Sequence, residues 1–364
     1  MIPVTILTGF LGSGKTTLLK RILNEPHGMK IAVIENEFGE ENIDNEILVQ
    51  DSQEQIIQMS NGCICCTIRG DLARVLGDLA QQKRDGKLDF DRVVIETTGL
   101  ANPGPVAQTF FMDNEIADEF LLDAIITLVD AKHGNHQLDE HEVVQRQVGF
   151  ADRLFITKAD LVDENELDDL RHRLVHMNPR AQIRQVNFGE ADIKEVFDLR
   201  GFNLNAKLEI DPDFLAEDDH AHAHAHDSHD HDHAHDHDHG DCDHDHGKCN
   251  HEGHDHGHHH HHAHHDDKIK SFVYRSDRAF DPNRLEDFLG GILQIYGERL
   301  LRYKGVLYMK GVDRKVVFQG VHQMMGSDLA AKWLPIEKKG SKMVFIGIEL
   351  PQDLITDGLD ACLA

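Results

Sequence analysis

The chain has 364 residues, of which 40% are hydrophobic, and a formal net charge of -28 at pH 7. This length and composition predict soluble globular structure, and no apolar run approaches the roughly 20 residues of a transmembrane helix, so we expect no membrane partner. The acidic balance and the lack of a basic stripe argue against a nucleic-acid partner, because phosphate binding relies on Lys and Arg. The first residues lack the pattern of a secretory signal, so we expect a cytoplasmic protein with reduced thiols.

From residue 1 to about residue 205, apolar strand-like runs alternate with amphipathic stretches. The runs are "VTILTG", "KIAVIEN", "EQIIQMS", "DRVVIETTG", "DAIITLVD", "DRLFITKAD" and "QIRQVN". The amphipathic stretches include residues 72–82, 136–150 and 165–177. Alternation of this kind predicts an α/β fold with a doubly wound, mostly parallel sheet, helices on both faces and strands buried on both sides.

The composition changes at about residue 206. Residues 206–267 become almost entirely Asp, His, Ala and Gly after Phe214 and Leu215, which predicts a disordered linker unless metal organises it. From 268 to 364 the runs "IKSFVYRS", "GVLYMKG", "KVVFQGVH" and "KMVFIGIEL" predict the strands of a smaller α+β domain. The stretch "DPNRLEDFLGGIL" predicts a helix capped by Asp281 with Pro282 in its first turn. The predicted domains are therefore 1–205, 206–267 and 268–364.

The stretch "GFLGSGKT", from Gly9 to Thr16, fits a phosphate-binding P-loop. It follows the strand-like "VTILT" and opens the helix-like "TTLLKRIL", which is the context that the motif requires and that a chance glycine-rich turn would lack. Lys15 would reach the outer phosphates and the Thr16 hydroxyl would ligate Mg²⁺. The residues expected to hold the nucleotide here are Gly9, Gly12, Ser13, Gly14, Lys15, Thr16 and Thr17.

The stretch "ITKAD", residues 156–160, bears on which base is bound. It is similar to the N-K-x-D guanine motif, with Thr157 in place of the asparagine. Asp160 can accept hydrogen bonds from guanine in an arrangement that adenine cannot satisfy, and the Lys158 stem can lie along the base. We expect GTP, while an ordinary strand-end loop with ATP as the nucleotide stays open.

The stretch "VVIETTG", residues 93–99, occupies the place of the metal-facing strand and phosphate-sensing loop of a P-loop protein. Glu96 is expected to act on Mg²⁺ or its bound water, and the Gly99 amide to reach the γ-phosphate. Together with Lys15 and Thr16, Glu96 completes the predicted catalytic set. A plain buried strand is the alternative.

Three cysteines, Cys63, Cys65 and Cys66, stand within four positions in "NGCICC". The spacing does not fit a closed zinc site built from two separated C-x-x-C pairs. Three thiolates leave a coordination position open, which suits a metal that is held and later released, and they favour Zn²⁺, with Co²⁺ or Ni²⁺ as competitors. Burial as small apolar side chains is the alternative. The acidic loop "IENEFGEENID", residues 34–44, is a candidate switch, with a solvated acidic turn as the alternative.

In this order, "GFLGSGKTT", "ENEFGE", "NGCICC", "VIETTGLANP" and "TKAD" resemble the motifs of the CobW-like P-loop GTPases, relatives of the nickel-insertion GTPases of urease and hydrogenase maturation. "LLRYKGVLYMKG", "FQGVHQ" and "FIGIELP" resemble the family's second domain, so the resemblance covers nearly the whole chain outside the histidine tract. It implies a zinc-responsive metallochaperone that binds GTP and hydrolyses it slowly. The implied metal ligands are Cys63, Cys65 and Cys66, with Glu35, Glu37 and Glu40 as candidate carboxylates. The sequence has no C-P-x-L-V-P stretch of the kind that docks some relatives onto a client aminopeptidase.

A histidine tract runs from His220 to His265 and includes Cys242 and Cys249. Neutral imidazoles bind zinc, nickel and copper, and Asp can neutralise bound cations, so we expect several weakly held ions. Protonation near pH 6.5 removes imidazole ligands, so binding should fall below about pH 6. A solvated spacer is the alternative, and both roles are compatible.

Two further functions compete with metal delivery to an unidentified client protein. A metal storage protein would rely on the histidine tract and have secondary nucleotide binding. A small-molecule kinase would use the same P-loop, but the second domain offers no obvious substrate acid or base. The oligomeric state is open, with a homodimer as one option.

Overall fold

The computed structural model describes residues 1–35, 55–58, 68–202 and 267–364, and these belong to one compact unit. The predicted ligands Cys63, Cys65, Cys66, Glu37 and Glu40 lie outside the described residues, as does the histidine tract. None of the helices in the described ranges combines the length and hydrophobicity that a bilayer crossing requires.

The strands are β1 (Ile2–Gly9), β2 (Ile31–Glu35), β3 (Gln55–Gln58), β4 (Arg92–Glu96), β5 (Phe120–Asp130), β6 (Arg153–Thr157), β7 (Gln182–Val186), β8 (Ile269–Ser276), β9 (Leu300–Leu307), β10 (Arg314–Val321), β11 (Met324–Lys332) and β12 (Ser341–Ile348). The helices are α1 (Lys15–Asn24), α2 (Ile68–Arg84), α3 (Pro103–Met112), α4 (Asn114–Glu119), α5 (Gly134–Glu140), α6 (Glu142–Phe150), α7 (Glu164–Met177), α8 (Ile193–Val196), α10 (Pro282–Tyr296), α11 (Gln352–Ala361) and the 3-10 helix η1 (Ala159–Leu161).

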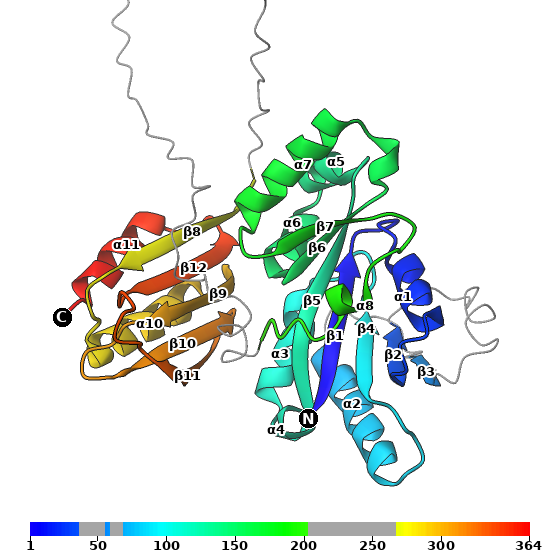
Figure 1. The fold of residues 1–364 in the computed structure, drawn as a ribbon, viewed down its shortest axis with the longest axis horizontal. Helices are drawn as coiled ribbons and strands as arrows, with labels where there is room; N and C mark the ends of the chain where they lie inside the picture. Colours follow the sequence, from blue (N-terminus) through cyan, green and yellow to red (C-terminus); the bar gives the residue numbers. More distant parts are fainter. Residues whose placement is uncertain (36–54, 59–67, 203–266) are drawn as a thin grey trace, which may run out of the picture. The chain divides into compact units, whose positions relative to one another are not determined.

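The first seven strands form one sheet in the order β3-β2-β4-β1-β5-β6-β7 (Figure 1). Every pairing in it is parallel. The strand order reverses at β1, so the loops that follow β1 and β4 open at the carboxyl edge beside this switch point, where open α/β sheets bind ligands. The predicted doubly wound P-loop fold is confirmed.

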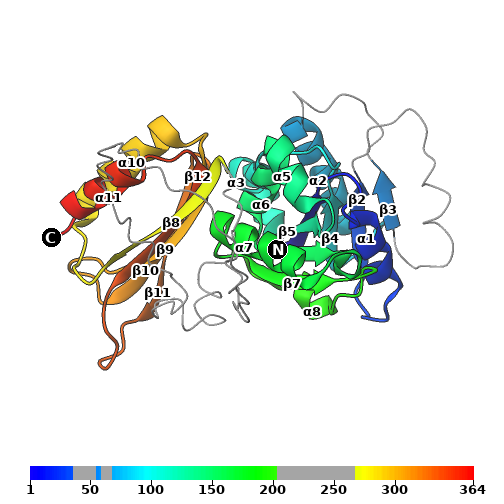
Figure 2. The ribbon, with the colours of Figure 1, turned by 90° about the horizontal axis from the view of Figure 1, so that it is seen from above.

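Helices cover both faces of this sheet, which explains why its central strands are apolar throughout. On one face, Leu18, Leu19 and Ile22 of α1 pack with apolar residues of the strands, and α8 joins them. The other face is covered by α2 to α7 (Figure 2). In β1, Val4 and Ile6 belong to the second of these cores and Leu7 to the first.

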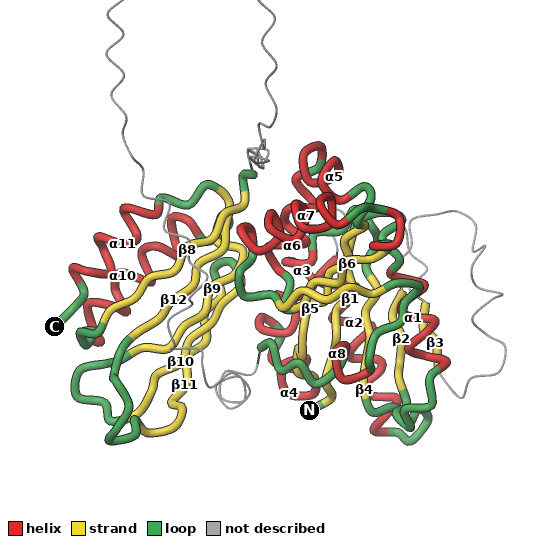
Figure 3. Tube along the Cα trace, turned by 45° about the horizontal axis from the view of Figure 1, so that its top comes forward, coloured by secondary structure: helices red, strands yellow, loops and turns green. Residues whose placement is uncertain are grey.

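The last five strands form an antiparallel sheet in the order β11-β10-β9-β12-β8. Helices α10 and α11 cover one face of it, as Figure 3 shows. Helix α10 begins as predicted: the Asp281 side chain accepts a hydrogen bond from the Arg284 amide, and Pro282 occupies the first turn. On the opposite face, Leu301, Val344 and Ile346 join the core that includes Val148 and Phe150 of α6.

The two described ends that flank residues 203–266 are each fixed by polar contacts. On one side, the Gly201 amide donates to the Asp123 carbonyl (2.7 Å), and Arg302 donates to the Gly201 carbonyl (3.1 Å). On the other side, the buried Asp267 carboxylate accepts from Arg173 at 2.6 and 3.0 Å. Both ends are therefore held in place by described residues.

The structure departs from the sequence prediction at one helix and at one sheet edge. The single amphipathic stretch 136–150 is two helices, α5 and α6, because His141 between them is extended (φ -131°, ψ 106°). Its ring stacks on Phe10 of the P-loop, 4.7 Å between centroids, a tertiary contact that helical periodicity cannot reveal. Strand β11 was not predicted because most of its residues are exposed, and pairing with β10 holds it at the sheet edge.

Candidate nucleotide site

The P-loop joins β1 to α1 and depends on glycine at three positions. Gly9, Gly12 and Gly14 have φ values of 143°, 74° and 95°, a region that side-chain-bearing residues rarely adopt. A Cβ on Gly9 would lie 2.4 Å from the Leu128 carbonyl oxygen, so this position has no space for a side chain. The Ser13 hydroxyl is buried and has no hydrogen-bond partner within the described ranges. The loop therefore has the backbone geometry that surrounds a phosphate group.

Lys15, at the start of α1, folds back over the loop. Its Nζ donates to the carbonyl oxygens of Gly9 (2.9 Å) and Phe10 (3.1 Å). Burial lowers the pKa of Lys15, and the nearby Glu96 carboxylate partly opposes this shift. A buried ammonium whose hydrogen bonds among the described residues go to neutral carbonyls is suited to bind an anion.

Thr16 and Glu96 lie together at the carboxyl edge of the sheet. The Thr16 hydroxyl donates to Glu96 Oε1 at 2.8 Å, and Glu96 ends β4 directly opposite Glu35, the last residue of β2. Because the Thr16 proton is engaged with the carboxylate, the lone pairs of its hydroxyl oxygen remain to coordinate a cation. Hydroxyl and carboxylate oxygens are the donors that Mg²⁺ prefers, so this pair fits the ion.

The residues of "ITKAD" contact the P-loop from the other side. Thr157 Oγ1 donates to the Ser13 carbonyl at 2.8 Å. Lys158 has a left-handed backbone, with φ 56°, and its Nζ donates to the Gly12 carbonyl (2.8 Å) and to Asp130 Oδ2 (2.6 Å). The "ITKAD" segment and the P-loop are therefore connected directly.

A cavity of about 330 Å³ lies between these two segments. Its lining consists of Gly14, Thr17, Leu18, Leu128, Thr157, Lys158, Asp160, Leu161, Val186, Phe188 and Gly189. The lining is mainly apolar with a few polar groups, as a small-molecule pocket requires. The structure thus brings Gly14, Thr17, Thr157, Lys158 and Asp160 to one cavity.

Phe188 and Gly189 form a wall of this cavity that the sequence did not single out, and Asn187 directly precedes them. The Asn187 side-chain oxygen accepts from the Ala159 amide at 3.0 Å, which braces the segment carrying Asp160. Phe188 has φ 52° and is 76% exposed beside the cavity. A positive φ at a residue other than glycine is uncommon and often marks a functional loop. This signal could have identified Phe188, but φ is known only from the structure.

The loop after β4 packs against the P-loop. A Cβ on Gly99 would lie 2.5 Å from the Leu11 amide nitrogen, so the two loops are in close contact at this glycine. The Gln147 amide of α6 donates to the carbonyl oxygens of Gly99 (3.1 Å) and Ala101 (3.0 Å). Sequence reasoning missed Gln147 because its partners precede it by more than 40 residues.

Of the predicted metal ligands, the structure describes only Glu35. It ends β2 beside Glu96, on the edge of the sheet that also carries the P-loop. Among the described residues, no group of three or more His, Cys, Asp and Glu side chains is close enough together to hold a metal ion. The cysteine site stays a prediction.

Two segments of the chain match the models of known protein domains. Residues 3–185 match the model of the CobW/HypB/UreG nucleotide-binding domain, and residues 269–363 match the cobalamin synthesis protein cobW C-terminal domain.

Individual relatives agree with these matches. The chain is 38% identical to "Zinc chaperone YjiA" of Escherichia coli, over 97% of this chain and 96% of the relative. It is 31% identical to "Zinc chaperone CobW" of Pseudomonas aeruginosa, over 100% of this chain and 92% of the relative. The crystal structure of Zn(II)-bound YjiA GTPase from E. coli matches with a TM-score of 0.73 and 33% identity, covering 100% of this chain and 99% of that one. This chain belongs to the CobW/HypB/UreG family and carries the C-terminal domain of its CobW members.

Proposed function

We propose that this protein is a GTP-dependent zinc chaperone that binds GTP with Mg²⁺, hydrolyses it slowly and couples hydrolysis to the delivery of zinc to a client protein. The observation that carries the proposal is the contact between Thr16 and Glu96 at the edge of a P-loop sheet, in a chain that resembles zinc chaperones over nearly its full length. The names of two of its relatives support zinc as the cargo.

In this proposal the P-loop holds the phosphates and Lys15 supplies the positive charge that they face. Thr16 and Glu96 hold Mg²⁺, which neutralises charge that develops on the phosphate oxygens. The Gly99 amide reaches the terminal phosphate. Thr157, Lys158 and Asp160 select guanine from within the cavity of about 330 Å³. Catalysis then rests on positioning and electrostatics.

We place the zinc cargo on Cys63, Cys65 and Cys66, with carboxylates among Glu35, Glu37 and Glu40 completing the site; Co²⁺ and Ni²⁺ are competing metals. The support is positional. Glu35 and Glu96 are register partners on adjacent strands, so the segment after β2 begins beside the residue that holds Mg²⁺ in this proposal. A change at the terminal phosphate can then alter the zinc site, and zinc must change nucleotide affinity by the same factor.

The test is a zinc titration under reducing conditions, with Mg²⁺ and either a non-hydrolysable GTP analogue or GDP. The proposal predicts tighter zinc binding with the analogue, and loss of that difference in Cys65→Ala. Equal zinc affinity in the two nucleotide states would refute coupled delivery.

Metal storage is a second candidate, favoured by the histidine tract from His220 to His265. Deletion of residues 220–265 separates the two functions. Storage predicts that the deletion abolishes metal tolerance in cells and that Lys15→Ala does not. Delivery predicts the reverse.

A further inference from the structure

Gln147 is an entirely buried polar residue near the centre of α6. Its side chain is 0% exposed, and its backbone carbonyl accepts a hydrogen bond from Thr127 Oγ1 on β5 at 2.8 Å. A buried amide loses its hydration on folding, so it is tolerated only where protein groups satisfy it. Its partners therefore indicate what the residue does.

Both hydrogen bonds of the Gln147 side chain go to the loop that follows Glu96. Nε2 donates to the carbonyls of Gly99 (3.1 Å) and Ala101 (3.0 Å). Oε1 is buried and has no hydrogen-bond partner in the described part of the chain. A single side chain thus fixes two carbonyls of the loop.

The same loop is pressed against the P-loop. Because a Cβ on Gly99 would come within 2.5 Å of the Leu11 amide nitrogen, no space separates the two segments. Holding the Gly99 carbonyl also fixes the peptide plane that carries the next amide, and it limits where the Gly99 amide can point.

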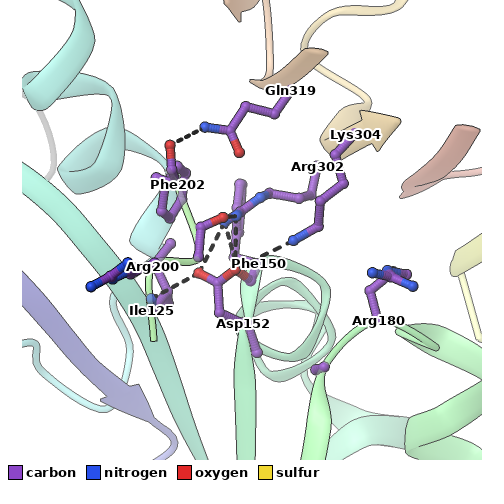
Figure 4. Close-up of polar contacts among 12 residues, drawn as sticks. Ile125, Phe150, Asp152, Arg180, Arg200, Phe202, Arg302, Lys304 and Gln319 are labelled. Atoms are coloured by element: carbon purple, nitrogen blue, oxygen red, sulfur yellow. Dashed lines mark hydrogen bonds and ion pairs between the residues drawn. The ribbon is translucent and has the colours of Figure 1, made fainter. Parts of the chain in front are cut away.

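Helix α6 is itself firmly supported, so Gln147 projects from a fixed base. The Gln145 Oε1 accepts from the amides of Lys268 (3.1 Å) and Ile269 (3.3 Å). At the other end of α6, Arg302 of β9 donates to the Asp152 carboxylate at 2.8 Å, and the Phe150 carbonyl lies beside it (Figure 4). The helix is thereby attached to the C-terminal sheet on both sides of Gln147.

We propose that Gln147 is a positioning residue for GTP hydrolysis, which holds the loop of residues 97–101 so that its amides meet the terminal phosphate. The inference rests on the proposed GTPase function and deepens it. Gln147 acts on the loop and not on the nucleotide, so its removal should slow the chemical step without weakening nucleotide binding.

The experiment compares Gln147→Met with Gln145→Met in the full-length protein. Both changes remove a buried amide from α6 that binds backbone groups, but only the first releases the loop. We expect Gln147→Met to lower kcat for GTP by about tenfold or more, with KM and the affinity for GDP changed by less than about twofold. Gln145→Met removes one attachment of α6 but leaves its contacts with Thr127 and Arg302 and both loop hydrogen bonds of Gln147, so kcat should stay within about twofold of the wild type.

Gln147→Glu provides an independent readout, including in the case that the Met variant does not fold. A carboxylate cannot donate to the two loop carbonyls, but a protonated carboxyl can donate to one of them. Burial raises the pKa of a carboxyl group toward about 7, so lowering the pH favours this donor form. The ratio of mutant to wild-type kcat should therefore rise as the pH is lowered from about 8 to about 6.

If Gln147→Met binds GDP and keeps the wild-type kcat, the inference is overturned but the proposed function is not. The same holds if the ratio of Gln147→Glu kcat to wild-type kcat does not change with pH. Wild-type protein that fails to hydrolyse GTP would overturn the proposed function and this inference with it.

Discussion

The Thr16 hydroxyl lies 2.8 Å from Glu96 Oε1 and joins the first turn of α1 to the end of β4. The bond gives the hydroxyl proton a fixed acceptor and orients the oxygen lone pairs away from the carboxylate. The two residues are 80 positions apart in sequence, and the parallel pairing of β1 with β4 brings them together.

Glu96→Gln tests this pair. The amide oxygen can still accept from Thr16, but the negative charge that would hold Mg²⁺ is lost. We expect GTP hydrolysis to fall by about 100-fold, with a higher Mg²⁺ concentration needed for half-maximal rate. Measuring the rate of phosphate release at a series of Mg²⁺ concentrations gives both the maximal rate and the Mg²⁺ concentration for half-maximal rate. Thr16→Ser keeps the hydroxyl and should hydrolyse GTP at close to the wild-type rate. If Glu96→Gln also hydrolysed GTP at the wild-type rate, Glu96 would not belong to the site.

Asp160→Asn tests guanine recognition. The substitution replaces two acceptors with one acceptor and a donor, so GTP should bind about 100-fold more weakly, since each lost charged hydrogen bond costs about 1.5–3 kcal/mol. Xanthosine triphosphate, whose 2-position presents an oxygen, should then bind better than GTP.

The control for this change is Asp163→Asn, three residues along the chain. Asp163 caps α7 by accepting from the Glu166 amide at 2.9 Å, and Asn is an equally good cap. Competition binding measures both variants. If Asp160→Asn bound GTP as tightly as the wild type, ATP would have to be reconsidered.

Arg302 and Asp152 form a buried ion pair between β9 and the segment after α6 (Figure 4). Arg302→Met removes the nearer cation from the buried Asp152 carboxylate and leaves Lys304 at 3.6 Å, so unfolding free energy should fall by about 3 kcal/mol. Adding Asp152→Asn should recover part of this loss, because the poorly compensated charge is gone. Urea unfolding measures the changes. Arg299→Met, which breaks the exposed pair with Glu349, should cost less than about 1 kcal/mol.

His322 predicts a pH dependence of stability. Its ring lies edge-on to Phe150, 5.2 Å between centroids, and burial lowers the pKa of His322. The neighbouring Arg146 lowers this pKa further, while contacts with Gly297 and Glu298 oppose the shift. Because the folded pKa is below the unfolded value of about 6.5, the stabilising contribution is complete above that pH and is lost as the pH falls toward the folded pKa.

The matching variant is His322→Asn, since Asn tolerates the left-handed backbone at this position, φ 54°. The difference in unfolding free energy between wild type and variant should shrink from about pH 7.5 to about pH 5.5, by up to about 1.4 kcal/mol for each tenfold difference in proton affinity between the folded and unfolded states. Taking the difference cancels the titration of the other histidines. A difference that does not change with pH would contradict the assignment.

Much of the fold could be read from the sequence because local signals and tertiary structure agree. Strand β8 spans the predicted residues 269–276, and Asp281 and Pro282 begin α10 as expected. Where the structure departs from expectation, the cause is a contact with a distant segment. His141 interrupts a helical pattern because it stacks on Phe10, and β11 is a strand because β10 pairs with it.

The site divides in the same way. Gly9, Lys15, Thr16 and Glu96 belong to motifs whose spacing carries their meaning, so they could be proposed from sequence. Gln147 and Asn187 could not, because each binds backbone groups far along the chain, and an isolated amide residue has no pattern of its own. Such supporting residues emerge only when the fold is known.

The anchoring of Gly201 by Asp123 and Arg302, and of Asp267 by Arg173, has a consequence for how this protein can evolve. Contacts among described residues secure the chain on both sides of residues 203–266. Natural selection can therefore lengthen, shorten or replace that stretch as an interchangeable cassette while these anchors and the P-loop sheet stay unaltered.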